Sequence, residues 1–532
     1  MKKLIALALA FTYILCLFTG CSNLFPGETS TTGPSSQKPA IPSLDKLYTE
    51  TIAVTVGDRE LTAVEVNYFY IDSINNYINQ NYYYINLGLI NLDMTKPLNQ
   101  QRVDTQSEET WADYFLNAAI TNIKSSFGLY DLAMKTNHKL TTEEELELAN
   151  LNYNLQQKAK KNQYTSVEEM LKAFYGNGAN LDSYQRYYRI STYARSYYNA
   201  YNKSLTYTSV QLREFEGIET YKYNSYSYAT YLIQVDTFLP DGETHTAEQK
   251  KAAQESAKRL AEMLATGFYT DSYDFDIAID TAIKEAKGES INQDEKLKYT
   301  STKTNDVLYD SLNTTFKDWL IGKVSDTGVE MPIFETRKQG DLTVVEKTSG
   351  SGESKTVTGY YVIRFEEVND NSYALANVRH ILVKFTDNPT NNATMVEINN
   401  AKVKAEHILE EFETGPKTED HFSTLATQYS DDGNKDIGGL YENVYPGQMV
   451  TNFNNWCFDE MRKAGDYGLI KTEFGFHLMY YVGDSETTFR DYMVSADMRE
   501  ADMVNWYEDI VASVKFEEKN LTLVNMAIVL RS

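Results

Sequence analysis

Residues 378–383 (Val-Arg-His-Ile-Leu-Val) and 475–479 (Gly-Phe-His-Leu-Met) are two short apolar runs that each carry one histidine. Apolar runs of this length and composition favour strands. Side chains alternate between the two faces of a strand, so His380 and His477 each lie on one defined face. If the strands pair in one sheet, the two imidazoles lie side by side on an otherwise apolar face. A buried imidazole without a partner is costly, which predicts a hydrogen-bond network around the pair.

The two histidine runs are the ends of one predicted α+β unit. Between the strands at 378–385 and 475–482 we expect three helices, at 394–414, 422–429 and 453–461. The stretch before this unit has the same order of elements. Its predicted strands and helices are a strand at 228–235, helices at 247–266, around Phe275 and around Phe316, and strands at 341–346 and 359–367. A duplicated unit with the order β-α-α-α-β is therefore predicted.

Local details support the duplication. Phe316 and Trp319 have the same spacing as Phe453 and Trp456, and a Gly-Tyr-Tyr-Val run at 359–362 corresponds to the Gly-Phe-His-Leu of the second unit. Aligning the repeats puts Tyr231 in the place of His380 and Tyr361 in that of His477, and the same alignment puts Leu312 in the place of Met449.

The region 46–220 is predicted to be mainly helical. Residues 51–61 alternate in polarity and contain a Gly-Asp turn, which predicts a short strand pair. Helix start signals follow at Thr62 with Glu65, at Thr141 with Glu144 and at Ser166 with Glu169. Later helical patterns lie at 109–137, 142–160, 166–175, 180–201 and 208–219.

The N-terminus has the features of an export signal. Two lysines are followed by an apolar run at 4–19, and small residues lead to Cys21. The run is short for a bilayer-spanning helix, which needs about 20 residues. Phe18-Thr-Gly-Cys21 resembles the lipobox of bacterial lipoproteins, in which the cysteine is lipidated; a plain signal peptide or an uncleaved anchor is the alternative. Residues 22–45 are rich in Ser, Thr, Gly and Pro, which predicts a flexible tether.

Charge and cysteine content exclude several classes of protein. The formal net charge of -25 leaves no basic stripe for a phosphate backbone, so nucleic acid is not an expected partner. After removal of residues 1–20, only Cys21 and Cys457 remain of the three cysteines. No intramolecular disulfide is expected once Cys21 is acylated, and Cys457 is predicted to be a small core residue.

The C-terminal residues 487–532 combine a helical pattern at 487–514 with an apolar run at 521–530 that favours a strand. We expect this helix to fold back onto the N-terminal helical domain.

Residues 373–483 resemble a parvulin (rotamase) domain. The resemblance rests on several motifs in one order: Arg379-His380-Ile-Leu-Val, Phe422 with Leu425-Ala426, Tyr429-Ser-Asp-Asp432, Gly438-Gly439, Gly447-Gln-Met449, Phe453, and Thr472-Glu-Phe-Gly-Phe-His477. With its leader, helical N-terminal part and C-terminal helix, the whole chain is similar to the PrsA-type foldase lipoproteins and the SurA-type chaperones. The implied fold is α+β: a mainly helical chaperone domain (SurA/trigger-factor-like) at 46–220 and two tandem parvulin-like domains at 226–368 and 373–483.

The resemblance implies roles for individual residues. The two central histidines of the family fall on His380 and His477, the acidic position on Asp432 and a hydroxyl of the same network on Thr472. The pocket for the proline ring is implied at Met449 and Phe453, with Phe458 lining it.

The implied activity is peptidyl-prolyl cis-trans isomerisation, without a cofactor. The rotation barrier of an X-Pro amide comes from resonance, so a site need only bind the twisted amide more tightly than the planar forms. We therefore favour a noncovalent role for the histidine network over attack by Asp432 as a nucleophile. A metal site from His380, His477 and Asp432 is the weaker alternative. Many members of this family have an aromatic pair before the Gly-Gln-Met motif. This chain has Asn443-Val444 there, and we expect this difference to widen the pocket.

The first repeat, 226–368, lacks both imidazoles in this alignment. We therefore expect it to be a degenerate domain without isomerase activity that binds peptide or acts as a spacer.

We expect a foldase that its N-terminal lipid anchors to the outer face of a cell membrane. A Gram-positive cytoplasmic membrane is the favoured location. Its expected partners are unfolded or newly secreted chains that contain proline. The alternatives are a holdase chaperone without catalysis and a surface lipoprotein that binds peptides.

Overall fold

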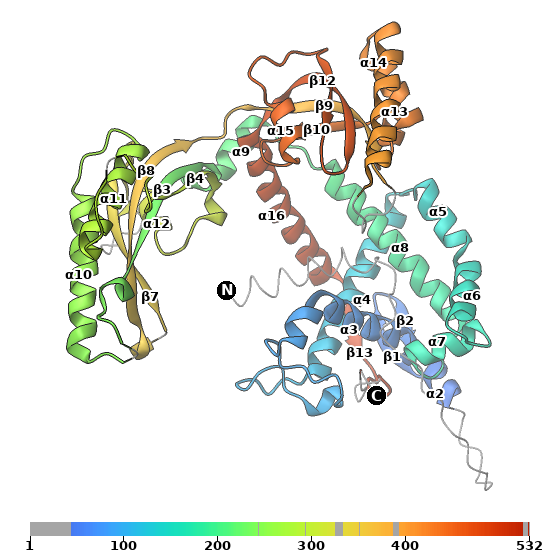
Figure 1. Cartoon of the computed structure of the whole chain (residues 1–532). Coiled ribbons are helices and arrows are strands. Elements are labelled where there is room, and N and C mark those ends of the chain that lie inside the picture. Colours follow the sequence, from blue (N-terminus) through green and yellow to red (C-terminus); the bar gives the residue numbers. More distant parts are fainter. Residues whose placement is uncertain are drawn as a thin grey trace. The chain divides into compact units, whose positions relative to one another are not determined.

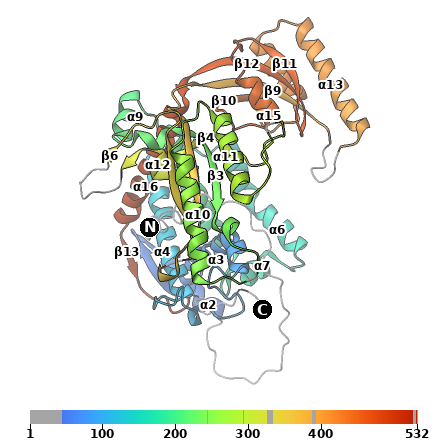
Figure 2. The ribbon, with the colours of Figure 1, turned by 60° about the vertical axis from the view of Figure 1, so that its left-hand side comes forward.

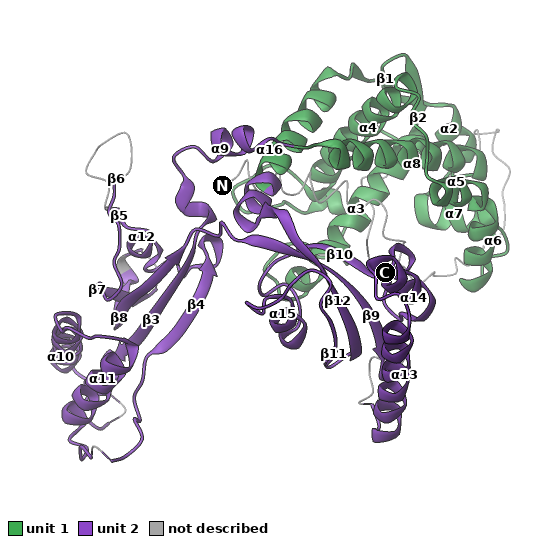
Figure 3. Cartoon of the chain, turned by 90° about the horizontal axis from the view of Figure 1, so that it is seen from above, with its two compact units in different colours: residues 1–206, 497–532 green, residues 207–496 purple. Residues whose placement is uncertain are grey.

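The computed structural model describes residues 44–242, 244–292, 294–324, 333–350, 352–386, 393–524 and 530. The predicted signal segment 1–21 with Cys21, and all but the last two residues of the predicted tether 22–45, lie outside these ranges. The chain divides into two compact units, residues 1–206 with 497–532 and residues 207–496 (Figure 3). No helix in the described ranges is long and apolar enough to cross a bilayer.

The first unit is built around three long helices, α3 (Ala63–Asn86), α4 (Trp111–Lys135) and α8 (Leu181–Ser204), which pack against one another (Figure 1). Its other helices are α2 (Leu44–Glu50), α5 (Thr142–Ala149), α6 (Leu151–Lys161), α7 (Val167–Tyr175) and the short η1 (Leu98–Gln100). The core is rich in aromatic rings such as Tyr68, Trp111 and Phe115, which are fully buried. Many of the tyrosines are therefore packing residues.

The predicted helix starts are confirmed. Thr62 with Glu65 and Thr141 with Glu144 form capping boxes at the first turns of α3 and α5. Ser166 caps α7 by accepting the Glu169 amide, whereas the Glu169 carboxylate turns back to Thr165 rather than to Ser166. These bonds satisfy backbone donors that have no partner within the helix.

The predicted helix 142–160 is two helices. α5 ends and α6 begins at Asn150, whose φ of −90° and ψ of 0° interrupt the regular helix. Asparagine tolerates such a break because its side chain competes for backbone hydrogen bonds.

The C-terminal helix α16 (Phe489–Ser513) supplies Met503, Tyr507 and Ile510 to a buried cluster with Ala194 and Tyr198 of α8. After it, β13 (Phe516–Glu518) joins β1 (Ile52–Val56) and β2 (Arg59–Thr62) in a small antiparallel sheet, in the order β13-β1-β2. The strand expected at 521–530 is not formed over 521–524, which is a turn, and 525–529 lie outside the described residues.

The described part of the second unit contains two four-stranded antiparallel sheets with equivalent strand orders, β4-β3-β8-β7 and β10-β9-β12-β11. The first sheet consists of β3 (Ser225–Gln234), β4 (Thr302–Leu308), β7 (Leu342–Ser349) and β8 (Thr356–Asn369). Its helices are α10 (Ala247–Ala265), α11 (Ser272–Lys287) and the single turn α12 (Lys317–Leu320). α10 packs on β3, β7 and β8. Figure 2 shows α10 in front of β3. The short elements of the region are α9 (Ser209–Glu216), η2 (Thr220–Tyr223), η3 (Val235–Phe238), η4 (Tyr309–Ser311), β5 (Lys323–Val324), β6 (Ile333–Phe334) and η5 (Gly352–Ser354).

The second sheet carries the two histidines. It consists of β9 (Ala374–Lys384), β10 (Leu440–Val444), β11 (Tyr467–Lys471) and β12 (Gly475–Thr488). α13 (Met395–Thr414) and α14 (Glu419–Tyr429) pack on one face, against Ile381 and Leu478. α15 (Thr451–Cys457) packs on the other face, against Val378 and Met479. The turn η6 (Lys435–Ile437) precedes β10.

α15 is shorter than the helix predicted at 453–461, because it ends at Cys457. The Asp459 carboxylate accepts the Met461 amide in a local turn, and Arg462 donates to the Trp456 carbonyl. The polar groups after Cys457 therefore have partners outside a continued helix.

Candidate active site

The register of β9 and β12 places the two histidines diagonally across neighbouring strands. His380 lies opposite Met479, and His477 lies opposite Leu382, so both imidazoles are on the face covered by α15. They are 2% and 5% exposed. The rings are nearly parallel, with an interplanar angle of 16° and centroids 5.3 Å apart, and the two Nδ1 atoms are 3.1 Å apart. The two predicted neighbours, His380 and His477, are therefore joined by a direct hydrogen bond.

Each histidine has a second partner at its Nε2 atom. His380 Nε2 lies 2.6 Å from Asp432 Oδ2, and His477 Nε2 lies 2.8 Å from Thr472 Oγ1. The Tyr441 hydroxyl donates to the same Oδ2 atom over 3.0 Å. The Thr472 hydroxyl oxygen also accepts the amide of Phe474. These groups form one continuous chain of hydrogen bonds across the sheet.

The direction of the chain follows from what each group can donate. An ionised Asp432 only accepts, so His380 carries its proton on Nε2 and accepts at Nδ1. His477 must then donate from Nδ1 and accept at Nε2 from the Thr472 hydroxyl. With both imidazoles neutral, every donor in the chain has an acceptor, and the tautomers are assigned from this network.

The electrostatics agree with the states of Asp432, His477 and Tyr441 in this assignment. The hydrogen bond from His380 holds the pKa of Asp432 well below its usual range. Burial, with His380 nearby, lowers the pKa of His477 to about 4. Burial and the neighbouring carboxylate raise the pKa of Tyr441 to about 12. An ionised carboxylate, a neutral His477 and a protonated tyrosine therefore coexist near neutral pH.

The loop after α14 positions Asp432. The Ser430 hydroxyl accepts the amides of Leu382 and Asp432, and the Asp431 amide donates to the Leu382 carbonyl. These bonds attach the loop to β9 two residues from His380. The carboxylate is therefore held by backbone contacts to the strand that carries its histidine.

Gly439 allows β10 to approach His380. Its φ is +70°, and a Cβ atom there would lie 2.2 Å from the carbonyl oxygen of His380. The Gly439 carbonyl accepts the His380 amide over 2.9 Å. Only a residue without a side chain fits this approach.

The predicted pocket residues occupy different places. Phe453 is buried, and its ring stands edge-on to both imidazoles, with centroids 5.4 Å from His380 and 5.8 Å from His477. Met449 lines a pocket of about 500 Å³ between the start of α15 and the end of β11. Phe458 is partly buried in the cluster behind Phe453 and does not line this pocket.

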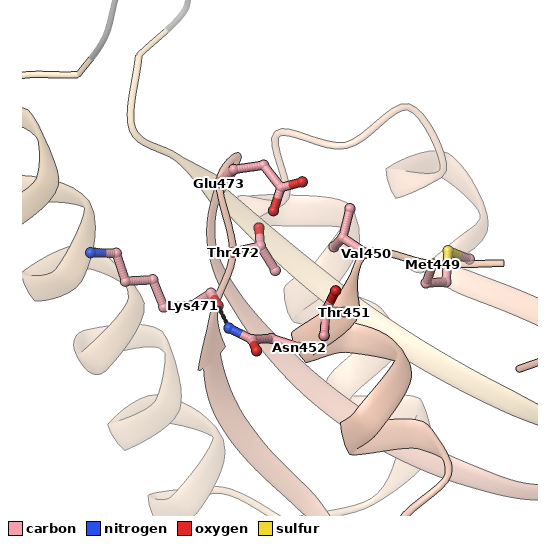
Figure 4. Close-up of a pocket in the computed structure, with 7 residues that line it drawn as sticks. All are labelled: Met449, Val450, Thr451, Asn452, Lys471, Thr472 and Glu473. Atoms are coloured by element: carbon pink, nitrogen blue, oxygen red, sulfur yellow. Dashed lines mark hydrogen bonds between the residues drawn. The ribbon is translucent and has the colours of Figure 1, made fainter. Parts of the chain in front are cut away.

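Thr472 connects the pocket to the histidines. It lines the pocket together with Met449, Val450, Thr451, Asn452, Lys471 and Glu473 (Figure 4). Its hydroxyl is the group that bonds His477. The Asn452 amide donates to the Lys471 carbonyl over 2.7 Å, which holds α15 to β11 below the pocket. An amide placed in this pocket would therefore lie next to the end of the hydrogen-bond chain.

Tyr441 is a member of the site that the sequence reasoning missed. It lies in a short edge strand, and its ring centroid is 5.1 Å from that of His380. Its one sequence signal is its position two residues after the Gly438-Gly439 pair. Val444 is buried in the α15 cluster, Asn443 has a φ of +56°, and the residues that line the pocket include neither of them.

The alignment of the two repeats was wrong by one residue in β3. In the second sheet the residue opposite Met479 is His380; in the first sheet the residue opposite the corresponding Ile363 is Thr230, whereas Tyr231 faces α10 and α11. Tyr361 does lie on the α12 face, 5.5 Å from Phe316. A slip of one residue moves a side chain to the other face of a sheet.

A metal centre is not favoured by the geometry. His380 and His477 direct their Nδ1 atoms at each other, and their Nε2 atoms at Asp432 and Thr472. Over the described residues, no group of three or more His, Cys, Asp or Glu side chains could hold a metal ion. Cys457 is buried and is not part of the network.

Comparisons with known proteins give one structure match and one family match. A crystal structure of peptidylprolyl isomerase (PrsA) from Bacillus cereus matches 29% of this chain and 55% of its own, with 23% sequence identity and a TM-score of 0.17. The match thus spans about half the length of that protein. No curated protein matches the chain. Residues 360–485 match the family model of the PPIC-type PPIase domain, and this range contains every residue of the hydrogen-bond chain. The chain therefore contains a parvulin-type (PPIC-type) PPIase domain, whose central strands are the two that bear His380 and His477.

Proposed function

We propose that this protein catalyses cis-trans isomerisation of X-Pro bonds in polypeptides. The observation that carries the proposal is the buried chain from Thr472 through His477 and His380 to Asp432, beside Phe453 and a pocket lined by Met449. The family match over 360–485 supports the same chemistry.

The proposed mechanism is noncovalent. Resonance gives the X-Pro amide a rotation barrier near 20 kcal/mol, and the uncatalysed exchange takes tens to hundreds of seconds. Met449 in the pocket and Phe453 beside the imidazoles form the apolar surroundings for the proline ring. The His380/His477 pair, with Thr472 and Asp432, provides fixed dipoles beside the rotating bond. A twisted amide that has lost resonance is bound more tightly there than the planar forms.

Asp432 is proposed as an orienting acceptor and not as a nucleophile. Its Oδ2 atom already accepts hydrogen bonds from His380 and Tyr441, and its Oδ1 atom accepts the Gly433 amide. Both carboxylate oxygens are therefore engaged with donors, and the rotation needs no covalent bond.

A proline-peptide isomerisation assay tests the proposal. His380→Ala and His477→Ala are each expected to reduce kcat/KM by roughly ten- to a hundredfold, the value of a lost hydrogen bond to a buried or charged group. The matched control is His407→Ala, because His407 is an exposed histidine on α13 of the same domain. A wild-type rate equal to the uncatalysed rate, or equal rates for all four proteins, would overturn the catalytic proposal.

We further propose that the protein is an extracytoplasmic lipoprotein, anchored through Cys21 to the outer face of a membrane. The lipobox-like sequence before Cys21 and the Pro/Ser/Thr-rich segment after it support this location. Mass spectrometry of the N-terminal peptide is expected to show a lipidated Cys21, and Cys21→Ser is expected to release the protein from the membrane fraction. An unmodified Cys21 in membrane-associated protein would contradict the anchor.

A holdase role is favoured by one separate observation in the helical unit. Residues 73–92 contain no charged side chain, although the chain as a whole is strongly acidic. At the end of α3 this segment exposes apolar side chains, including Tyr83 (69% exposed) and Leu89 (70%). Exposed apolar patches of this kind bind other chains.

The holdase role is tested by aggregation of an unfolded client. The double variant Tyr83→Ser/Leu89→Ser is expected to suppress aggregation less well than the wild type, with isomerase activity unchanged. The matched control is Leu146→Ser/Tyr153→Ser, two exposed apolar residues elsewhere in the same unit. If both double variants lost the same amount of aggregation suppression, the segment at the end of α3 would have no specific role in binding clients.

A further inference from the structure

Tyr441 lies at the Asp432 end of the hydrogen-bond chain. It lies on β10, the edge strand next to β9, with its Cα paired to that of Val378. Its hydroxyl donates over 3.0 Å to Asp432 Oδ2, the atom that also faces His380 Nε2. Its ring lies 5.1 Å from the His380 ring and 6.4 Å from the Phe453 ring.

The carboxylate needs such a partner to hold one orientation. Rotation about the terminal torsion of an aspartate is soft, so each further donor narrows the range of orientations that the Asp432 carboxylate plane can adopt. The Gly433 amide donates to Oδ1 over 2.7 Å, and Tyr441 with His380 holds Oδ2. Donors at both oxygens fix the carboxylate, and through it the nitrogen of His380 that carries the proton.

We propose that Tyr441 is a positioning residue for the isomerase: its hydroxyl orients Asp432, and Asp432 in turn fixes the Nε2-protonated tautomer of His380 and the Nδ1-protonated tautomer of His477. The proposal rests on the proposed function for its catalytic consequence. Tyr441 itself acts only through Asp432, so its effect is on the state of the histidine pair and not on substrate contact.

The Tyr441 hydroxyl remains a hydrogen-bond donor at every pH near neutrality. Its pKa is raised to about 12 by burial and by the carboxylate beside it, so the hydroxyl stays protonated. A lysine or histidine at this place would bring a charge to His380, whereas the phenol donates without one.

The chain has only six histidines, so the ring-nitrogen resonances of each can be resolved by NMR. The chemical shifts of these nitrogens report the tautomer of each ring. Protein labelled with ¹⁵N at histidine is compared between the wild type, Tyr441→Phe and the matched control Tyr467→Phe. Tyr467 lies on β11 of the same sheet, and its ring packs against Phe412 on the opposite face. His380→Gln and His477→Gln identify the two resonance pairs.

In the wild type and in Tyr467→Phe, His380 and His477 are each expected to show one tautomer. In Tyr441→Phe the ring nitrogens of His380 are expected to shift to a mixture, with kcat about five- to tenfold lower and KM within about twofold. In an Asp432→Asn background, Tyr441→Phe is expected to add little further loss, because the two residues act in series. Ring-nitrogen shifts and rates in Tyr441→Phe that equal those of the wild type would overturn the proposal.

Failure of this inference is distinguishable from failure of the isomerase function. A wild type without isomerase activity, in which Tyr441→Phe still mixes the tautomers, would reject the proposed function and keep the positioning role. A rapid isomerase whose tautomers and kcat do not respond to Tyr441→Phe would keep the function and reject the positioning role. An Asp432→Asn protein that loses a further five- to tenfold on Tyr441→Phe would also reject it.

Discussion

His477 is buried at the junction of the pocket and the histidine pair, and its ionisation is suppressed there. Burial and the nearby His380 lower its pKa to about 4 from an ordinary value of 6.5. The neutral imidazole is also the form that satisfies the whole hydrogen-bond chain, because its Nε2 atom can then accept from Thr472. The same arrangement gives the protein a defined response to pH.

Stability is expected to fall as the pH is lowered from 6.5 to 4. In this window the unfolded chain binds a proton on His477 and the folded protein does not, so acid favours unfolding by roughly 3 kcal/mol. Urea unfolding at several pH values measures the slope. His477→Gln cannot titrate at this position and is expected to show a shallower slope. The same slope in both proteins would contradict the assignment of a neutral, buried His477.

The Thr472 hydroxyl is expected to contribute to stability as well as to the site. Thr472→Val leaves His477 Nε2 and the Phe474 amide without this partner, at a cost of about 1–3 kcal/mol in the free energy of unfolding. The matched control is Thr424→Val, an exposed threonine on α14 whose hydroxyl bonds only the Asp420 carbonyl. Denaturant unfolding compares the two. A similar small loss in both variants would contradict a buried network at Thr472.

At the scale of elements, the contact between β10 and β9 depends on one glycine. Gly439→Ala combines a left-handed backbone with a Cβ atom 2.2 Å from the His380 carbonyl oxygen. We expect a loss of about 3 kcal/mol in the free energy of unfolding. Gly433→Ala is the control in the same loop, because a Cβ atom there meets nothing within 4 Å. Thermal or urea unfolding checks this, and equal stability of the two alanine variants would contradict the close strand approach.

The pairing of the edge strand β10 with β9 is irregular. β10 has only five residues, and its register with β9 shifts between Tyr441 and Val444. Such an irregularity redirects side chains at a sheet edge. It allows Tyr441 and Val444, which are three residues apart, to lie on the same face, in the cluster around α15, with the Tyr441 hydroxyl bonded to Asp432.

At the scale of the whole molecule, Arg490 connects three separate segments of the second unit. Its guanidinium donates to Glu216 and to the carbonyls of Thr220 and Asp370, and it is 8% exposed. These contacts join α9 and η2, the connection between the two sheets, and the start of α16. Glu216 is itself 5% exposed, so the pair is a buried ion pair.

Arg490→Met is expected to destabilise the second unit by about 3 kcal/mol, because it leaves Glu216 buried with only the half-exposed Arg213. The control is Lys402→Met, which removes an exposed pair with Glu406 on α13 and is expected to change stability by less than about 0.5 kcal/mol. Hydrogen exchange over residues 213–224 and 369–373, together with urea unfolding, measures both. Unchanged exchange in Arg490→Met would contradict its role as a connector.

Much of the fold was predictable because local patterns govern it. The period of two in the histidine strands fixed the face of each imidazole, and the capping residues fixed the starts of α3, α5 and α7. The repeated order of elements predicted two units, and the structure has two sheets with equivalent strand orders. The assignment of a parvulin-type domain was also available from the motifs and agrees with the family match.

The tertiary structure decided how distant residues meet. His380 and His477 are 97 positions apart, and their diagonal contact follows from the strand register. Tyr441 joins the site because a loop and an edge strand dock on β9, which no local pattern records. Thr230 rather than Tyr231 occupies the place of His380 in the first sheet, since register is set by pairing along the whole strand. The sequence motifs thus pointed to His380, His477, Asp432 and Thr472, whereas long-range packing brought these side chains into contact and added Tyr441, because strand register and loop docking depend on distant segments.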